Sequence, residues 1–398
     1  MAQPRKSTKN AYLALFFATL ALSINFWAWA ILSPLGGHYE SIFDLNPTTL
    51  SFLLAIPVLV GSLGRIILGA LTDRYGGKAI FAITCFLTAI PVFCLTFAKE
   101  FPTLAIVAIF LGLGGAIFAV GVPYISAWFR PEQRGLMLGL YGIGDAGTAL
   151  AAFFTLPLIS GIGESMTFSL VAALLVVCGL IFVKWGKNSP SWKPSKGSFV
   201  RRLSTALKQP VTWDLSIIYA VTFGAFVAFG VYLPVLLKVA YGLSLTDAAM
   251  RAGGFILLAT LARPLGGWIS DKVGGKHVVR VSLLLIALLA GFVAVQPSLA
   301  TSTTVAYLSL AFVLGACSGA VFALVGRAVK PGLIGGVTGV VGAIGGLGGF
   351  IPPLILGATY EQTGSYSFAL GMLAISSAVV LIYMHRRFKN KKLYSYTP

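Results

Sequence analysis

Residues 64–78 read Gly64-Arg65-Ile-Ile-Leu-Gly-Ala-Leu-Thr-Asp73-Arg-Tyr-Gly-Gly-Lys78, and residues 262–276 repeat the pattern as Ala262-Arg263-Pro-Leu-Gly-Gly-Trp-Ile-Ser-Asp271-Lys-Val-Gly-Gly-Lys276. In each copy an arginine lies eight residues before an aspartate. On a helix this spacing corresponds to roughly 12 Å along the axis, so an arginine lies near the midplane of a membrane if the aspartate marks its surface. An intramembrane arginine costs at least about 2.5 to 3.5 kcal/mol on insertion scales and is a candidate functional residue. Two of them at equivalent positions predict one shared anion site.

The composition indicates an integral membrane protein. Of the 398 residues, 57% are hydrophobic and 10% are charged, and the mean hydropathy is +0.91. A soluble domain carries roughly 25% charged residues. Apolar stretches of spanning length predict twelve transmembrane helices, at about 12–35, 48–71, 79–98, 101–122, 136–160, 166–185, 213–237, 249–270, 278–296, 303–325, 333–357 and 366–385. The first stretch exceeds the length of a signal peptide and lacks a small-residue cleavage site, so we expect it to be retained.

The basic residues predict the orientation. Nearly all lysines and arginines of the loops fall on one side of this topology, and Lys99, Lys238 and Arg251 fall on the other. The positive-inside rule therefore places both termini in the cytoplasm of a multi-pass inner (cytoplasmic) membrane protein. We expect an N-terminal six-helix half at 1–185, a cytoplasmic linker at 186–212, and a C-terminal half with a short basic tail at 213–398. A net charge of +18 can also indicate nucleic-acid binding, but these charges are spread over short loops at helix ends, so no nucleic-acid partner is expected.

No pattern in the sequence predicts a metal site, a cofactor or an enzyme. The four cysteines are isolated in apolar stretches without a CxxC spacing, which favours buried free thiols. The three histidines fall in predicted loops or at helix ends, and no Walker-type glycine loop with Lys-Ser/Thr is present.

Two glycine-rich segments form a pair, Gly135–Thr148 in the fifth expected helix and Gly335–Pro353 in the eleventh. Glycine destabilises a helix by about 1 kcal/mol relative to alanine, so this density indicates either close helix packing or backbone exposed to a ligand. A second pair is Phe118 in the fourth helix and Phe322 in the tenth. In the seventh helix Tyr219, Phe223, Phe226 and Gly230 share one face, which lipid contact or core packing would also explain.

The combined motifs resemble the nitrate/nitrite porter family of the major facilitator superfamily over essentially all twelve helices. The two Asp-Arg/Lys-x-Gly-Gly-Lys turns resemble the signature loop of the superfamily. The narrower resemblance is carried by Ile56-Pro57 to Gly69 around Arg65, Phe223-Gly-Ala-Phe226 to Pro234, Arg263-Pro-x-Gly-Gly, the fifth-helix glycine motif, and Gly345-Gly-Leu-Gly-Gly-Phe-Ile-Pro-Pro353. It implies an all-α membrane protein with the major facilitator fold of two six-helix halves.

The resemblance also implies a site. In that family, arginines of helices two and eight clamp the planar anion, aromatic residues sandwich it, and the glycine-rich helices line the pocket. Carried over to this sequence, the residues are Arg65, Arg263, Phe118, Tyr219, Phe223, Gly142, Gly144, Gly345 and Gly346. A departure is Asp145, which stands where many relatives have asparagine.

The expected function is secondary active transport of nitrate, nitrite or both by rocking of the two halves. Guanidinium is planar, stays charged and presents a rigid fork of donors, which suits a planar oxyanion. The first interpretation is proton-coupled nitrate uptake, and the alternative is a nitrate/nitrite antiporter that extrudes nitrite. A non-transporting anion sensor is less favoured, because a short linker and a short tail offer no output domain. The expected partners are nitrate, nitrite, protons and the lipid bilayer, and the expected state is a monomer.

Four carboxylate and basic residues receive separate roles. Counted from Gly135, Asp145 lies roughly 15 Å along its helix, close to the depth of both arginines. It is either a proton-coupling residue or a local counter-charge to one arginine. Asp73 and Asp271 are expected to hold helix ends at the cytoplasmic gate through basic residues that include Arg134.

Overall fold

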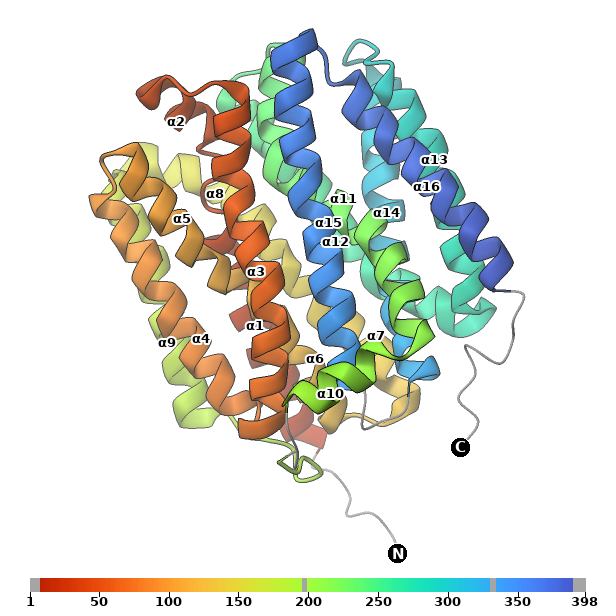
Figure 1. Ribbon diagram of the computed structural model, residues 1–398. Helices are drawn as coiled ribbons and strands as arrows, with labels where there is room; N and C mark the ends of the chain where they lie inside the picture. The colour runs from red at the N-terminus through yellow and green to blue at the C-terminus, as the bar shows by residue number, and fades with distance from the viewer. Residues whose placement is uncertain (1–7, 195–198, 330–333, 389–398) are drawn as a thin grey trace, which may run out of the picture.

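The computed structural model is a bundle of long helices that run side by side (Figure 1), and it describes residues 8–194, 199–329 and 334–388. Within those residues, twelve helical segments are long and apolar enough to cross a membrane, which confirms the predicted number. The elements of the first half are α1 (Thr8–Ala30), α2 (Gly36–Phe43), α3 (Pro47–Tyr75), α4 (Gly77–Cys94), η1 (Leu95–Phe97), α5 (Phe101–Ala116), α6 (Phe118–Trp128), α7 (Pro131–Gly142), η2 (Ile143–Ala146), α8 (Gly147–Ile162) and α9 (Glu164–Trp185). Those that follow are α10 (Phe199–Leu207), α11 (Pro210–Tyr241), α12 (Leu245–Val273), α13 (Gly275–Ala294), α14 (Thr301–Ala328), α15 (Ile334–Thr363) and α16 (Ser367–Arg387).

Several boundaries differ from the sequence prediction. The first helix ends at Ala30 rather than near residue 35, because Pro34 disfavours helical backbone for Ser33 and lacks an amide hydrogen. Two short helices, α2 and α10, were not anticipated, and α10 lies inside the stretch expected to be a plain linker. The fourth span is broken at Ile117, between α5 and α6.

The sequence repeat is also a structural repeat. Asn46 caps α3 by accepting a hydrogen bond from the Thr49 amide (2.8 Å), and Ser244 caps α12 by accepting one from the Asp247 amide (3.2 Å). Both helices end at a glycine with positive φ, 84° at Gly76 and 90° at Gly274, a conformation that residues with a Cβ rarely adopt. Each cap and each turn is separated from its counterpart by the same number of residues as Arg65 from Arg263.

The two arginine helices lie at the boundary between the halves. α3 packs along α15, and α12 packs against α7 and α8. Each arginine helix therefore meets the glycine-rich helix of the opposite half.

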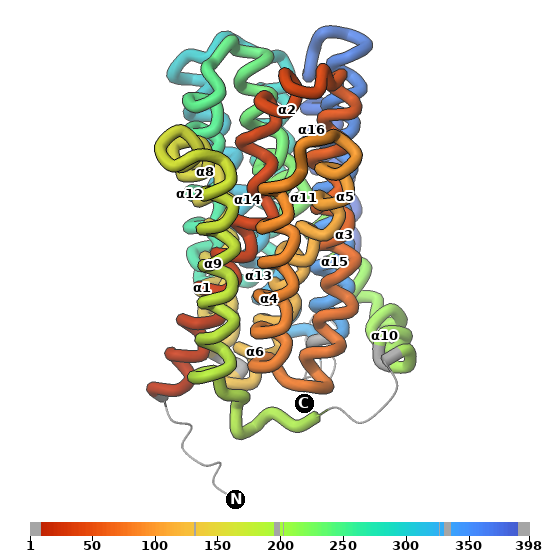
Figure 2. The backbone as a smooth tube through the Cα atoms, turned by 90° about the vertical axis from the view of Figure 1, so that its left-hand side faces the viewer, coloured from red at the N-terminus to blue at the C-terminus, as the bar shows by residue number. Residues whose placement is uncertain are grey.

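The outer surface of the bundle is apolar. Large side chains that are 55–65% exposed lie on several helices, among them Ile67, Ile90, Phe110, Ile375 and Ile382. Figure 2 shows the helices side-on, with α10 at one end of the bundle and α2 at the other. We call the end with α10 and the turns at Gly76 and Gly274 the basic end. Twelve apolar spans with a lipid-compatible surface make this a multi-pass membrane protein.

Candidate functional site

Arg65 of α3 and Arg263 of α12 meet in the interior of the bundle, where they are 1% and 3% exposed. Both guanidinium groups lie over the same two rings. Their Cζ atoms are 5.5 Å and 6.0 Å from the Phe118 centroid, and 5.1 Å and 5.0 Å from the Phe223 centroid. Ring faces attract cations, but two like charges in an apolar interior still repel each other. The arrangement therefore favours an anion that contacts both arginines.

Arg65 bonds to neutral backbone groups. Its Nε donates to the carbonyl oxygen of Gly115 (3.1 Å) and its Nη1 donates to that of Gly342 (2.8 Å). Gly115 lies in the last turn of α5, where carbonyl groups lack an intrahelical donor. The break between α5 and α6 thus provides an acceptor for the first arginine.

Arg263 bonds to a carboxylate and a phenol. Its Nη1 donates to Oδ2 of Asp145, and its Nη2 donates to the Tyr219 hydroxyl at 3.1 Å. Asp145 lies in the 3₁₀ segment η2 and is 0% exposed. Its second oxygen, Oδ1, has no hydrogen-bond partner among the described residues. The structure therefore pairs Asp145 with Arg263.

Aromatic side chains enclose the arginines. Tyr219 and Phe223 stack with centroids 4.6 Å apart and an interplanar angle of 1°. Phe322 contacts Phe118 (5.5 Å) and Tyr219 (5.1 Å), and Phe226 lies under Arg263 at 5.4 Å. Phe322 and Phe226 were not among the expected site residues, although the pairing of Phe322 with Phe118 across the repeat is a signal that could have identified the former.

Three of the four expected pocket glycines lie at the arginines or at Tyr219. A methyl group added at Gly142 would lie 3.4 Å from Nη1 of Arg263, and one at Gly346 would lie 3.3 Å from Nη1 of Arg65. At Gly345 it would lie 2.1 Å from Cδ1 of Tyr219. Gly144 instead faces α1, where a methyl group would lie 2.7 Å from Cβ of Leu22. The glycine-rich helices thus pack closely, with three of these glycines against the site side chains and one against α1.

The expected gating residues lie at the basic end. Oδ1 of Asp271 pairs with Nη2 of Arg327 at 2.9 Å, a basic residue that was not among the expected gating residues. Nε of Arg134 donates to the carbonyl oxygens of Ser126 (3.0 Å) and Phe129 (3.3 Å). Gly135, which follows Arg134 in α7, faces the second turn, since a methyl group at Gly135 would lie 3.2 Å from Oδ2 of Asp271. Asp73 holds the equivalent place at the end of α3.

The opposite end is closed by polar contacts between the halves. Oγ of Ser33 donates to the carbonyl oxygens of Gly230 (3.0 Å) and Val231 (2.7 Å). Nζ of Lys238 pairs with Glu40 of α2 at 3.2 Å, and Thr48 bonds to Glu361. At this end the two halves are therefore joined, and the two arginines lie buried between this end and the basic end.

At the same end, Tyr39 of α2 contacts Glu164 within the first half. Burial and the neighbouring Glu164 raise the pKa of the Tyr39 hydroxyl, so it remains a protonated donor to Glu164.

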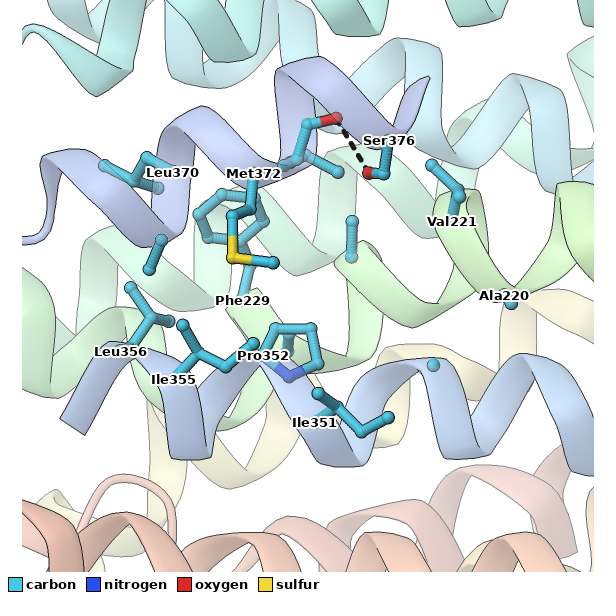
Figure 3. A pocket seen from close by; sticks show the side chains of 15 residues that line it. Ala220, Val221, Phe229, Ile351, Pro352, Ile355, Leu356, Leu370, Met372 and Ser376 are labelled. Atoms are coloured by element: carbon cyan, nitrogen blue, oxygen red, sulfur yellow. Dashed lines mark hydrogen bonds between the residues drawn. The ribbon is translucent and has the colours of Figure 1, made fainter. Parts of the chain in front are cut away.

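A separate cavity of about 250 Å³ lies between α11, α15 and α16 (Figure 3). Its lining is apolar and includes Phe229, Pro352 and Met372, and the hydroxyl of Ser376 in its wall donates to the Leu373 carbonyl at 3.1 Å. Because it presents no cationic group, this cavity is not the anion site.

Comparison with known proteins gives the family. Residues 18–353 match the Major Facilitator Superfamily. A Mycobacterium tuberculosis protein named "Probable nitrate/nitrite transporter NarK2" is 40% identical over 379 residues, covering 94% of this chain and 96% of that protein. The chain belongs to the nitrate/nitrite porter family of the major facilitator superfamily. Another family member, the Bacillus subtilis "Nitrite extrusion protein", is 34% identical and is covered to 94%.

Solved structures confirm the major facilitator fold of this porter-family chain. The human organic anion transporter MFSD10 (TETRAN) aligns with a TM-score of 0.74 at 14% identity, covering 96% of this chain and 100% of that one. A bacterial homolog of the human lysosomal transporter Spinster, in an inward-facing and unoccupied conformation, aligns with a TM-score of 0.71 at 18% identity. The names of the sequence relatives of this porter-family member describe transport proteins.

Proposed function

We propose that this protein is a secondary active transporter that carries nitrate, nitrite or both across the cytoplasmic membrane by alternating access. The observation that carries the proposal is the convergence of Arg65 and Arg263, one from each half, on the rings of Phe118 and Phe223. The names of its relatives, which describe nitrate and nitrite transporters, support the choice of anion.

The geometry links binding to the movement of the halves. Each guanidinium presents a planar fork that matches two oxygens of a planar oxyanion. An anion held between the two forks removes the repulsion between the arginines, which favours closure of the halves around the site. We take residues 1–185 and 213–398 as the moving units, rocking about a site near the midplane as in other transporters built from repeats.

Proton-coupled nitrate uptake is the main interpretation. It is supported by Asp145, a buried carboxylate in direct contact with a clamp arginine. Nitrate/nitrite antiport is the second candidate. It is supported by the name of the Bacillus subtilis relative and by a Thermus thermophilus relative named "Probable nitrate/nitrite antiporter NarK1", which is 33% identical over 303 residues.

We further propose that the basic end faces the cytoplasm. Arg74, Lys78, Lys272 and Lys276 flank the two turns at this end, and such residues concentrate on the cytoplasmic side of membrane proteins. Both chain termini then lie in the cytoplasm of an inner-membrane protein.

Reconstituted transport tests these proposals. Purified protein in liposomes is given external labelled nitrate under two conditions: an empty lumen with an inward proton gradient, or a nitrite-loaded lumen at equal pH. Symport predicts accumulation in the first condition, and antiport predicts it in the second. Liposomes with the Arg65→Lys/Arg263→Lys double variant are the control for leak. Nitrate binding without flux in either condition would indicate a sensor and contradict the transport proposal.

A further inference from the structure

Asp145 occupies a position on Arg263 that an incoming anion would need. Its Oδ2 accepts from Nη1 of Arg263, and a methyl group added at Gly142 would lie 3.4 Å from the same Nη1. A carboxylate and nitrate are both planar oxyanions that take up the fork of a guanidinium in the same way. Asp145 thus occupies a hydrogen-bond donor of Arg263 that a substrate anion would also use.

The two arginines differ in this respect. The partners of Arg65 are the carbonyl oxygens of Gly115 and Gly342, which do not titrate, and no carboxylate of the described residues pairs with it. Of these hydrogen-bonded acceptors, the carboxylate of Asp145 on Arg263 is the one that can lose its negative charge by taking up a proton.

The second carboxylate oxygen of Asp145 is positioned to take a proton. Oδ1 is buried and accepts no hydrogen bond within the described ranges, and an ionised oxygen without a donor is costly in an apolar interior. The charged group in contact with Asp145 is Arg263 from α12, and Tyr219 from α11 accepts from the same arginine. Arg65 from α3 lies near Arg263, and Tyr141 from α7 lies near Arg65. From α1, which packs against η2, no charged side chain reaches this depth, because the charged residue of that helix, Lys9, lies at its start.

We propose that nitrate displaces Asp145 from Arg263 and that the released carboxylate takes up one proton, so that anion and proton enter the site together. The proposal rests on the proposed nitrate transport. The proton comes from water on the side to which the site is open, and a new O–H bond forms on Asp145 while nitrate stays ionised. Before binding, the site holds two cations and one carboxylate, and after binding it holds two cations and one nitrate. Its net charge is unchanged, which avoids a further desolvation cost.

Nitrate binding to the purified wild-type protein tests the coupling. The measurements are the nitrate dissociation constant from pH 5 to 8 by calorimetry, and the protons taken up per nitrate, read from the binding enthalpy in buffers of different ionisation enthalpy. We expect one proton per nitrate. Linkage then weakens the affinity about tenfold for each unit by which the pH rises. This slope holds over the range in which Asp145 is ionised in the empty protein and protonated in the nitrate complex.

Two variants localise the proton. Asp145→Asn should bind nitrate with no proton uptake and an affinity that does not vary with pH. Asp214→Asn is the matched control, because Asp214 is also buried (1% exposed) and pairs with an arginine, Nη2 of Arg387 at 2.9 Å, but at the start of α11. It should retain the wild-type proton uptake.

The outcomes separate the two proposals. Wild-type binding without proton uptake would overturn the coupling and leave the proposed transport intact, and this arm needs no variant to fold. Proton uptake that persists in Asp145→Asn would likewise overturn it. If wild-type protein bound no nitrate at any pH, the proposed function itself would fail.

Discussion

The carbonyl oxygen of Gly342 accepts a hydrogen bond of 2.8 Å from Nη1 of Arg65, and this bond crosses from one half of the protein to the other. The bond from Arg263 to Asp145 crosses the same boundary in the opposite direction. Each clamp arginine is therefore tied to the glycine-rich helix that faces it. In the proposed rocking of the halves, these two bonds connect the moving units at the site itself.

The two cross-boundary bonds are not equivalent. The glycines of the fifth and eleventh helices align as Gly135 with Gly335, Gly139 with Gly339, and Gly142 with Gly342, which sets Asp145 opposite Gly345. One half therefore offers a carboxylate where the other has no side chain. This asymmetry makes Arg65 the arginine with an uncompensated charge and Arg263 the one with a counter-ion.

The first prediction concerns the clamp. Arg65→Lys and Arg263→Lys keep the charge but lose the planar fork, and disruption of a buried charge-assisted contact costs about 2 to 5 kcal/mol. Each variant should weaken nitrate binding roughly 30-fold to several thousandfold, measured by calorimetry on purified protein. Arg251→Lys is the control, since Arg251 is paired with Asp247 at an exposed position away from the site. Near-normal affinity in either clamp variant would remove that arginine from the site.

The second prediction concerns Gly345. A methyl group there would lie 2.1 Å from Cδ1 of Tyr219, so Gly345→Ala must displace the ring whose hydroxyl accepts from Arg263. We expect nitrate transport to fall by about tenfold or more while the protein stays folded. In Gly371→Ala the added methyl meets nothing within 4 Å, so that variant should transport normally. Equal activity of the two variants would show that the position of Tyr219 does not matter.

The twelve spans were predictable because length and hydropathy alone define a helix that crosses a bilayer. Which of the two arginines pairs with Asp145 was not. Counting residues along a helix gives the depth of a side chain, whereas its direction depends on how the helix is rotated. Gly142 and Gly144 illustrate this: two residues apart, they point to different faces, one toward Arg263 and the other toward Leu22.

The helix α10 was not predicted, for another reason. It spans Phe199–Leu207 and carries two adjacent arginines, so neither its length nor its hydropathy resembles a membrane span. Short helices are marginal alone, and this one is held by its neighbours. Thr212 Oγ1 donates to the Ala206 carbonyl at 2.7 Å, and Trp213 Nε1 donates to the Leu207 carbonyl at 2.8 Å.

The third prediction concerns the turns at the basic end. The Asp271–Arg327 pair is partly exposed, with side chains 32% and 51% accessible, so its loss should cost less than about 1 kcal/mol of stability. Both aspartates lie at the basic end and not at the arginines, so Asp271→Asn, and Asp73→Asn at the equivalent position, should change turnover more than nitrate affinity. Arg327→Gln should behave like Asp271→Asn, as the opposite member of the same pair. A collapse of equilibrium nitrate binding in folded protein would contradict a gating role.

The fourth prediction concerns transport by Asp145→Asn. Asparagine can still accept a hydrogen bond from Arg263 but cannot carry a proton. The variant should therefore exchange labelled nitrate for internal nitrate or nitrite, yet fail to accumulate nitrate against a gradient when driven by an inward proton gradient. Both fluxes are measured on the same liposomes, so the exchange rate controls for the amount of folded protein. Unchanged proton-driven accumulation would leave Asp145 as a local counter-charge of Arg263. Loss of both fluxes, with nitrate binding intact, would instead show that the carboxylate is needed for the movement of the halves.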